Sequence, residues 1–533
     1  MSPSREAGRR HLACNLSPGT CNLLIVSDYD VIVVGAGSGG SVIAARLTED
    51  PSVRVLLIEA GPDYPNAEAL PEDLRDARRG SFVDHDWKLR YTPTSTSRTD
   101  VPFARGRVTG GSSAVNTCIA LRGDAADYDE WAALGCDGWA WEDVLPFFIR
   151  LEHDLDFPDV PYHGNSGPLP IRRHTRDELV PYQAAFLDAC AELGYPARPD
   201  HNAPGTTGYG PHPMNKQGTL RISNAIAYLA SARNRPNLTI MADTSVRRVT
   251  FHERNVTGVE AVTRDGATVS IAAPHVVLAG GAIHTPAILV RSGVGPRDVL
   301  QRLAIAEVAR SEGVGENLMD HPAIGPTLVP KEGVAHFDQP VIQTTLYYTA
   351  TGSDDVNDMQ LEPLSYMHIP GGRLLMGLAA CVFKSYSRGR LEFDSADVDA
   401  RPGIFMDYLS DERDYAKLRD GLERAMHLVN TRAIASVSDG VRRPTDAELS
   451  DEAVLEAWIR RNASTGAHPS CTARMGPDGD PTAVCDPRGR VRGVHGLRVA
   501  DASLMPVVPR ANTNIPTIMI GERFGEWLRE DAI

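Results

Sequence analysis

Short apolar runs alternate with glycine-rich turns from one end of this chain to the other. Residues 31–34 are apolar at every position, which is typical of a strand buried on both faces of a parallel sheet. A glycine-rich turn at 35–40, an amphipathic stretch at 41–47 and a second apolar run at 55–58 follow. Strand, turn, helix and strand in this order predict a βαβ unit at the start of a domain that begins at Asp28.

Similar apolar runs recur much later in the chain. One at 275–279 ends in two glycines, and one near 497–500 ends at Asp501, ahead of a C-terminal helix. Such widely separated strands predict a nucleotide-binding domain assembled from several segments, with the polar, Pro- and Gly-rich stretches between them folding as a substrate-binding lobe. We therefore expect an α/β protein, α+β overall, with a Rossmann-like domain of residues 28–160, 215–325 and 462–533 and a sheet-and-helix lobe of residues 161–214 and 326–461.

Residues 1–27 do not follow this pattern. Arg5, Arg9 and Arg10 precede an apolar stretch at 23–26 that is too short for the core of a signal peptide, and no small-residue cleavage pattern follows it. We expect this segment to be a disordered or misassigned N-terminal extension.

Composition and charge exclude several classes of protein. The 533 residues are 42% hydrophobic and 23% charged, and no apolar run is long enough to cross a bilayer. The formal net charge of -15 argues against a nucleic-acid partner. The eight cysteines form no C-x-x-C pair, so neither a zinc cluster nor a disulfide framework is indicated. We expect a cytoplasmic protein without a bound metal.

The turn at 35–40 carries a dinucleotide fingerprint. Gly35, Gly37 and Gly40 satisfy G-x-G-x-x-G, in which the glycines allow a tight turn, close approach to a pyrophosphate and close packing of helix on strand. Glu59 ends the second strand, where an acid accepts hydrogen bonds from an adenosine ribose and disfavours a 2′-phosphate. This motif predicts a dinucleotide site and leaves NAD and FAD open.

Several longer segments carry a more specific likeness. Residues 106–123 read GRVTGGSSAVNTCIALRG and resemble the first signature of the glucose–methanol–choline oxidoreductases. Residues 281–295 resemble the second signature of that family, and 317–322, 468–476, 497–502 and 512–517 resemble other recurring segments in the same order. The resemblance covers about residues 28–528, with the nearest likeness to bacterial choline-oxidase or choline-dehydrogenase and hydroxymethylfurfural-oxidase-like members. It implies FAD as the cofactor and an alcohol as the substrate.

The same resemblance implies a set of residues that hold the flavin cofactor. The fingerprint and Glu59 are expected to bind the ADP half of FAD, and the loop after Gly106 is expected to bind the flavin. The helix that begins near Pro516 is expected to point its N-terminus at the pyrimidine edge of the flavin. The expected FAD-binding residues are Gly35, Ala36, Gly37, Ser38, Gly40, Glu59, Ala60, Arg107, Gly110, Gly111, Ser112, Asn116, Thr117, Cys118, Ile119, Val246, Asp501, Ala502, Asn514 and Pro516.

The resemblance also assigns the chemistry. Oxidation of an alcohol needs a base near flavin N5, and neutral histidine meets that demand. His468 lies where family members carry this base, and Asn512 lies at the position of its partner. His163, His284 and His321 are interpreted as structural. Two positions depart from the family pattern: Cys471 replaces the usual glycine three residues after the histidine and is interpreted as a packing residue, and Thr109 replaces a leucine.

The resemblance also gives expectations for how the flavin is attached and for the kind of alcohol that is oxidised. Some relatives attach the flavin through a histidine immediately before the signature asparagine, but that position is Val115, so noncovalent FAD is expected, with Cys118 as the alternative attachment point. Residues 343–348 contain tyrosines but no acid, which favours an uncharged primary alcohol, aromatic, furanic or aliphatic, over choline. A non-redox flavoprotein of the hydroxynitrile-lyase type and an NAD-linked dehydrogenase remain as alternatives. The electron acceptor is O2 or another molecule, and a homodimer is possible.

Overall fold

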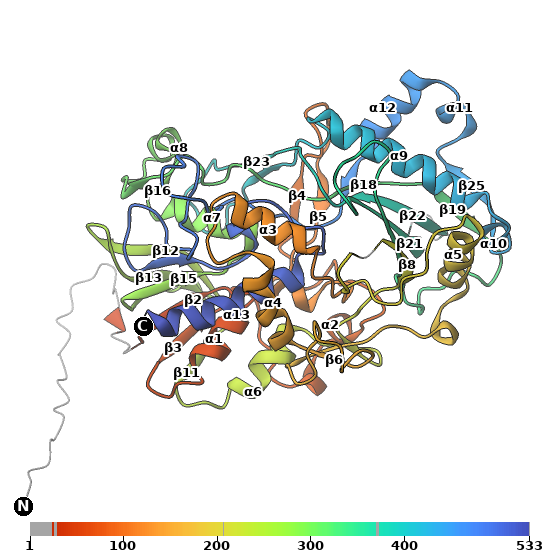
Figure 1. The fold of residues 1–533 in the computed structure, drawn as a ribbon. Coiled ribbons are helices and arrows are strands. Elements are labelled where there is room, and N and C mark those ends of the chain that lie inside the picture. The colour runs from red at the N-terminus through yellow and green to blue at the C-terminus, as the bar shows by residue number, and fades with distance from the viewer. Residues whose placement is uncertain (1–23, 26–28, 206, 369–372, 532–533) are drawn as a thin grey trace, which may run out of the picture.

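The computed structural model describes residues 24–25, 29–205, 207–368 and 373–531 (Figure 1). The N-terminal extension predicted for residues 1–27 lies outside these residues, apart from the two-residue strand β1 (Leu24–Ile25), which pairs in parallel with β14 (Thr268–Ala272). Among the described residues, no helix is both long enough and apolar enough to cross a membrane.

A five-stranded parallel sheet forms one end of the molecule. Its strands, in spatial order, are β11 (Leu238–Met241), β3 (Val55–Ile58), β2 (Val31–Val34), β15 (His275–Leu278) and β27 (Leu497–Val499). Residues of β2 and β3 are buried at every position, as a strand covered on both faces requires. Four of these strands match predicted apolar runs, β11 was not predicted, and the predicted α/β class is confirmed.

Helices and a second sheet cover the parallel sheet. Helix α1 (Gly40–Leu47) follows β2 and packs against the C-terminal helix α13 (Asn514–Glu530), and the two lie side by side in Figure 1. On the other side, β14 joins β13 (Asn255–Thr263) and β12 (Thr244–His252) in an antiparallel layer, against which α7 (Gly281–Arg291) packs. The parallel sheet is therefore covered by helices on one face and by the antiparallel layer on the other.

A larger sheet of eight strands forms the opposite end of the molecule, and all seven of its strand pairings are antiparallel (Figure 1). Helices α5 (Pro181–Glu192), α9 (Glu412–Val429) and α10 (Arg432–Ala435) contact this sheet. Its strands are β8 (Gly208–Pro211), β18 (Pro322–Ile324), β19 (Thr327–Pro330), β20 (Thr344–Tyr348), β21 (Met359–His368), β22 (Leu374–Val382), β25 (Ser438–Arg443) and β26 (Ser464–Thr465).

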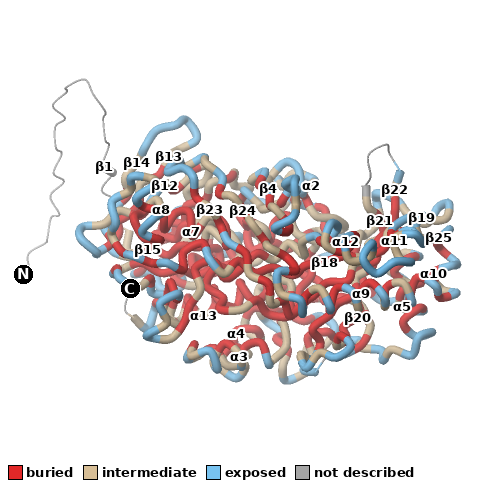
Figure 2. The backbone as a smooth tube through the Cα atoms, turned by 90° about the horizontal axis from the view of Figure 1, so that it is seen from above, coloured by how far each residue is buried: buried red, intermediate tan, exposed pale blue. Residues whose placement is uncertain are grey.

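Shorter elements lie outside these sheets, and one large hydrophobic core cluster runs through both ends of the molecule (Figure 2). These shorter elements are α2 (Glu72–Arg75), β4 (Leu89–Tyr91), β5 (Val101–Phe103), α3 (Ala125–Ala133), α4 (Trp141–Leu151), β6 (Glu152–Asp154), β7 (Leu169–Ile171), β9 (Lys216–Gln217), β10 (Leu220–Arg221), α6 (Ala230–Ala232), β16 (Val294–Gly295), α8 (Arg297–Arg302), β17 (Ala309–Arg310), β23 (Arg390–Glu392), β24 (Gly403–Phe405), α11 (Asp446–Leu449) and α12 (Glu452–Asn462).

A buried network of charges stabilises the region around β6. Its three carboxylates, two guanidinium groups and one imidazole belong to Glu152, Asp154, Asp200, Arg122, Arg173 and His163. The Nδ1 atom of His163 lies 2.7 Å from Glu152, and its Nε2 atom lies 2.9 Å from Asp200. A protonated His163 therefore balances the charge of the network. Burial opposes that proton, but the hydrogen bonds to Asp200 and Glu152 outweigh burial and raise the pKa of His163.

This arrangement predicts a pH-dependent contribution to stability. Because the folded state raises the pKa of His163, its contribution is complete below the unfolded pKa of about 6.5 and is lost as the pH rises through the folded value. We expect His163→Gln to lower the melting temperature most in mildly acidic buffer and progressively less as the pH rises. Thermal melts of both proteins across this range measure the difference, and a difference that does not change with pH would contradict a protonated His163.

Candidate active site

A cavity of about 390 Å³ opens between the carboxyl ends of the parallel strands and the eight-stranded sheet. Such an edge, where several strand ends meet helix N-termini, is the usual ligand site of an open α/β sheet. The cavity brings together most of the residues that the sequence nominated. These are Gly35, Gly37, Ser38, Glu59, Ala60, Gly111, Ser112, Asn116, Thr117, Ile119, Val246, His468, Asp501, Ala502, Asn512 and Asn514.

Six nominated residues lie beside the cavity without lining it. Ala36 donates its N–H to Glu59, Arg107 lies over the ring of Trp87, and Cys118 packs against Ala77 and Met214. The other three are Gly40, Gly110 and Pro516, which belong to the first turn of α1, the loop before Gly111 and the first turn of α13.

The three fingerprint glycines do different work. Gly35 has a φ of +98°, and a Cβ atom there would lie 2.5 Å from the carbonyl oxygen of Ala279. A Cβ atom on Gly40 would lie 1.9 Å from the carbonyl oxygen of Gly35, so α1 packs against the turn only without one. A Cβ atom on Gly37 would meet nothing nearer than the Cα atom of Gly111, at 3.9 Å, and Gly37 lines the cavity. The space kept free at Gly37 therefore suits a bound diphosphate.

Glu59 is held at the end of β3 by main-chain donors. Its two carboxylate oxygens accept from the N–H groups of Ala36 and Gly61, each at 2.9 Å. Burial raises the pKa of Glu59 to about 7, and additional donors such as ribose hydroxyls would favour the ionised form. The carboxylate is thus placed on the cavity wall where the fingerprint predicts a ribose contact.

Asp501 ties the end of β27 to the start of α7. Its Oδ2 atom accepts from the N–H of Gly281 at 2.8 Å and from the hydroxyl of Thr285 at 2.6 Å. This contact fixes the α7 N-terminus, whose Gly281 and Ala282 line the cavity. The positive end of that helix therefore faces the same space as the turn at 35–40.

Two half-buried asparagines each have one buried polar atom without a partner at the cavity. The Oδ1 atom of Asn512 and the Nδ2 atom of Asn514 are buried without a hydrogen-bond partner, although Asn514 accepts from the hydroxyl of Ser38 at 2.8 Å. Buried polar groups are normally paired, so such atoms on a cavity wall indicate a polar ligand. Both residues lie at the N-terminus of α13.

His468 stands at the centre of a hydrogen-bonded group. Its Nε2 atom lies 2.9 Å from Nδ2 of Asn512, and its Nδ1 atom lies 3.0 Å from Nδ1 of His321. Because the amide donates to Nε2, the proton of the imidazole is on Nδ1 and is donated to His321. Burial, together with His321 and Arg105, holds the pKa of His468 well below its ordinary value. A neutral imidazole, whose Nε2 lone pair accepts from the amide of Asn512, therefore faces the cavity.

Asp320 holds the two histidine segments together. Its Oδ1 atom accepts from the main-chain N–H groups of His321 and His468, each at 2.7 Å, and its Oδ2 atom accepts from Tyr408 at 2.6 Å and from Thr465. Burial raises the pKa of Asp320, while these donors lower it. Asp320 therefore acts on the base only by positioning it.

The sequence analysis missed part of this group. His321 was interpreted as structural, but it contacts His468, and its ring stacks on Phe383 with 4.6 Å between centroids. His284, also interpreted as structural, lines the cavity and lies 4.0 Å from the ring of Trp87. The recurring segment at 317–322 was the available signal, because it carries Asp320 and His321 side by side.

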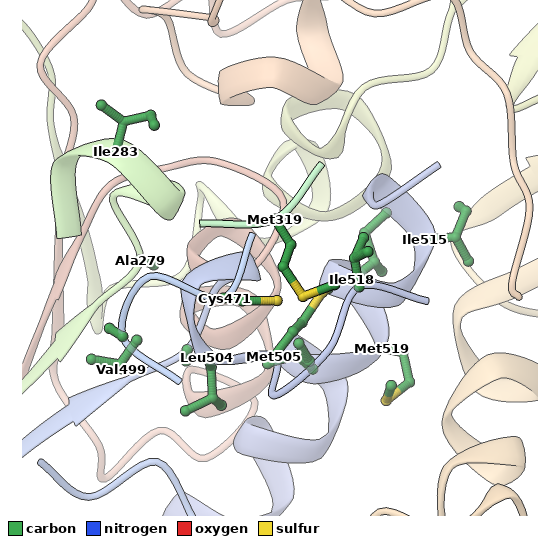
Figure 3. Close-up of a cluster of buried hydrophobic side chains, with 14 of the residues drawn as sticks. Ala279, Ile283, Met319, Cys471, Val499, Leu504, Met505, Ile515, Ile518 and Met519 are labelled. Atoms are coloured by element: carbon green, nitrogen blue, oxygen red, sulfur yellow. The ribbon is translucent and has the colours of Figure 1, made fainter. Parts of the chain in front are cut away.

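Cys471 has an environment that explains why this position favours glycine. Its φ of +73° lies in the left-handed region, which glycine adopts most readily. The side chain is fully buried and lies near Met319 and Met505 (Figure 3). Burial raises the pKa of its thiol to about 12, so no thiolate is available there. This environment agrees with the packing role assigned from the sequence, and the six cysteines of the described region are all unpaired and buried.

Known protein families and individual proteins are similar to this chain over most of its length. Family models described as GMC oxidoreductase match residues 29–323 and 385–521. The chain is 37% identical to the 5-(hydroxymethyl)furfural oxidase of Methylovorus sp. (strain MP688), with 95% of this chain and 99% of that protein covered. It is 35% identical to the oxygen-dependent choline dehydrogenase of Stenotrophomonas maltophilia (strain K279a), with 94% and 95% covered.

Among solved structures, the chain is similar to the crystal structure of pyridoxine 4-oxidase from Mesorbium loti. The TM-score is 0.87 and the sequence identity 29%, with 94% of this chain and 99% of that chain covered. The similarity therefore extends through both sheets and the cavity between them.

Proposed function

Since the chain belongs to the GMC oxidoreductase family, whose members are FAD-dependent enzymes that act on alcohols, we propose that it oxidises a primary alcohol to an aldehyde with His468 as the general base. The family resemblance found in the sequence, and the two kinds of relative named there, are confirmed. The observation that carries the proposal is the pairing of His468 with Asn512 in the same cavity as the glycine turn. FAD supplies, at its N5 atom, the acceptor for the hydride that leaves the alcohol carbon.

The cavity fits FAD at both ends. The turn at Gly37 leaves room for a diphosphate, and Glu59 lies on the adjoining wall for the ribose. The unpaired atoms of Asn512 and Asn514 lie where the flavin ring is expected. The N-terminus of α13 adds its positive dipole end there. These are the contacts that we assign to the cofactor.

His468 and Asn512 hold the substrate hydroxyl between them. In the structure the amide of Asn512 donates to Nε2 of His468. The substrate hydroxyl replaces that contact, so that the amide donates to the hydroxyl oxygen and Nε2 accepts the hydroxyl proton. The imidazolium that forms keeps its other N–H donated to His321, whose own pKa burial lowers to about 3. His321 thus stays neutral and remains an acceptor while the proton sits on His468. Asp320 fixes the positions of both histidines by accepting from their main-chain N–H groups.

The walls near the base favour an uncharged organic alcohol. Phe383, Ile342 and Ile119 line the cavity and belong to one apolar cluster with Cys381. The tyrosines of residues 343–348, which the sequence analysis considered as substrate contacts, do not line it, and Tyr347 packs behind Phe383 with 5.5 Å between centroids. We propose an aromatic, furanic or aliphatic primary alcohol as the substrate.

A choline-type substrate is the second candidate, because one carboxylate, that of Glu362, lines the cavity from β21. We expect benzyl or furfuryl alcohol to give a kcat/KM for flavin reduction about tenfold or more above that of choline, because the apolar walls bind a ring. Anaerobic stopped-flow reduction measures this ratio. Preferential turnover of choline would overturn the substrate proposal, and a flavin that no alcohol bleaches would favour the non-redox, lyase-type alternative.

The flavin is expected to be held without a covalent bond. Val115 lines the cavity and has no nucleophilic atom, and Cys118 is buried outside the cavity against Ala77 and Met214. Acid precipitation should therefore release all of the FAD into a yellow supernatant. A yellow pellet, with a flavinylated peptide found by mass spectrometry, would contradict this expectation.

O2 or another molecule as electron acceptor, a cytoplasmic location and a homodimer stay predictions from the sequence. Steady-state assays with O2 and with artificial acceptors, together with light scattering of the purified protein, are the direct measurements of the acceptor and the oligomeric state.

A further inference from the structure

Strand β21 brings two polar side chains to the substrate end of the cavity. Gln360 and Glu362 are two residues apart on this strand, so both project from the same face. The opposite face packs on α9, where a Cβ atom added to Gly421 would lie 2.8 Å from Met359 and 2.7 Å from Ala380. Gln360 and Glu362 therefore point away from α9, and both line the cavity that contains His468.

The carboxylate of Glu362 is only half-partnered. Its Oε1 atom accepts from Nε2 of His212 at 2.9 Å. The side chain of His212 is fully buried, and its Nδ1 atom has no hydrogen-bond partner. Within the described part of the chain, Glu362 has no other ion pair or hydrogen bond, and its side chain is 13% exposed. A carboxyl oxygen without a hydrogen-bond donor thus remains on the cavity wall.

Gln360 adds a second acceptor next to this carboxylate. Its amide nitrogen lies 3.4 Å from the hydroxyl of Tyr347, and its amide oxygen makes no hydrogen bond with the described residues. Two neighbouring oxygen acceptors that lack donors favour a ligand that carries a hydrogen-bond donor.

Glu362 lies farther along the sheet from the base than Gln360 does. Phe383 stands beside His468, with 6.4 Å between ring centroids, and follows β22 directly. Gln360 pairs with Cys381, and Glu362 pairs with Ala379, which is four residues before Phe383. At ~3.3 Å per residue, Phe383 is about 13 Å along the strand from the partner of Glu362 and about 7 Å from the partner of Gln360. The longer distance suits a small ring-bearing alcohol together with the reach of the side chains at its two ends.

We propose that Glu362, assisted by Gln360, is a specificity-determining residue that binds a hydrogen-bond donor on the substrate, at the end remote from the reacting hydroxyl. The substrate is then an alcohol with a second hydroxyl or an amine at its far end. This inference rests on the proposed alcohol oxidation. It also separates the substrate from choline, whose quaternary ammonium has no N–H to donate.

The test compares three para-substituted benzyl alcohols on the FAD-loaded protein. 4-Methylbenzyl alcohol has no remote donor, 1,4-benzenedimethanol has a neutral donor and 4-(aminomethyl)benzyl alcohol has a cationic donor. For each compound, kcat/KM is measured by anaerobic flavin reduction. The dissociation constant is measured from the flavin absorbance change in a His468→Ala background, before the slowed flavin reduction sets in. The preference for a donor is the kcat/KM of the donor compound divided by that of the methyl compound. In terms of binding, it is the dissociation constant of the methyl compound divided by that of the donor compound.

We expect Glu362→Gln to lower this preference by about 10- to 100-fold for at least one donor compound, since a charge-assisted hydrogen bond is lost. Which donor loses more identifies a hydroxyl or an ammonium as the natural group. Glu362→Asp should restore part of the preference. Glu456→Gln, which removes a carboxylate from the exposed surface of α12, is the matched control and should leave the ratio unchanged.

Equal ratios in wild type and Glu362→Gln would overturn the inference, as would an equal loss for all three compounds, which a merely structural role would produce. The dissociation constants keep this result separate from the proposed function. If no alcohol reduces the flavin, the proposed function fails, while the binding ratios still decide the role of Glu362.

Discussion

Replacement of His468 by alanine should lower the rate constant of flavin reduction by about 10²–10⁴-fold while the protein keeps its FAD. The imidazole is the group that accepts the hydroxyl proton, and without it the proton has no acceptor at hydrogen-bond distance from Asn512. FAD is retained because its proposed contacts lie along the turn at Gly37, Glu59 and α13 rather than at His468. Rapid-mixing experiments with saturating alcohol in the absence of O2 measure the rate constant directly.

The pH dependence of the same rate constant tests the state of the base. Burial and the neighbouring His321 and Arg105 hold the pKa of His468 well below 6.5, so Nε2 stays unprotonated at neutral pH. The rate constant should therefore remain flat as the pH falls through 6.5 and decline only in more acidic solution. A decline centred near 6.5 would show that the imidazole is exposed to water.

His427→Ala serves as the matched control, because His427 is exposed on α9, which packs on the eight-stranded sheet. It should reduce its flavin at the wild-type rate. A near-normal rate in His468→Ala, with His427→Ala also normal, would remove His468 from the mechanism.

The sequence predicted those features that depend on neighbouring residues. The runs at 31–34 and 55–58 are apolar throughout and became strands β2 and β3, because such a run is stable only where both faces are covered. The strand β11 was missed, since Leu238–Met241 includes a threonine and has no glycine turn after it to mark its end. Boundaries between the two predicted lobes stay predictions.

The candidate site depended on contacts between distant segments, which periodicity does not reveal. His321 lies 147 residues before His468 and Asn512 lies 44 residues after it, so only the family motifs brought the last two together. Cys471 was noticed as a departure from glycine, but its left-handed φ became visible only in the structure. Glu362 escaped attention because the sequence of β21 does not show which face packs on α9.

The separate tasks of the fingerprint glycines lead to a second large effect, on cofactor binding. We expect Gly37→Ala to fold normally and to bind FAD at least ~10²-fold more weakly, a loss of about 2.7 kcal/mol. The new Cβ atom would have only an ordinary contact, 3.9 Å from the Cα atom of Gly111, so the protein tolerates it. It would, however, occupy the space through which a diphosphate approaches the main chain.

Gly40→Ala provides the contrast, because its Cβ atom would lie 1.9 Å from the carbonyl oxygen of Gly35, which α1 can relieve only by moving off the turn. This variant should lose folding stability first and FAD as a result. Circular dichroism melts and FAD titrations by fluorescence quenching separate the two outcomes. Gly37→Ala is expected to be a folded, colourless protein whose melting temperature rises only at high FAD concentration. A yellow Gly37→Ala with wild-type affinity would mean that the diphosphate does not pass over this turn.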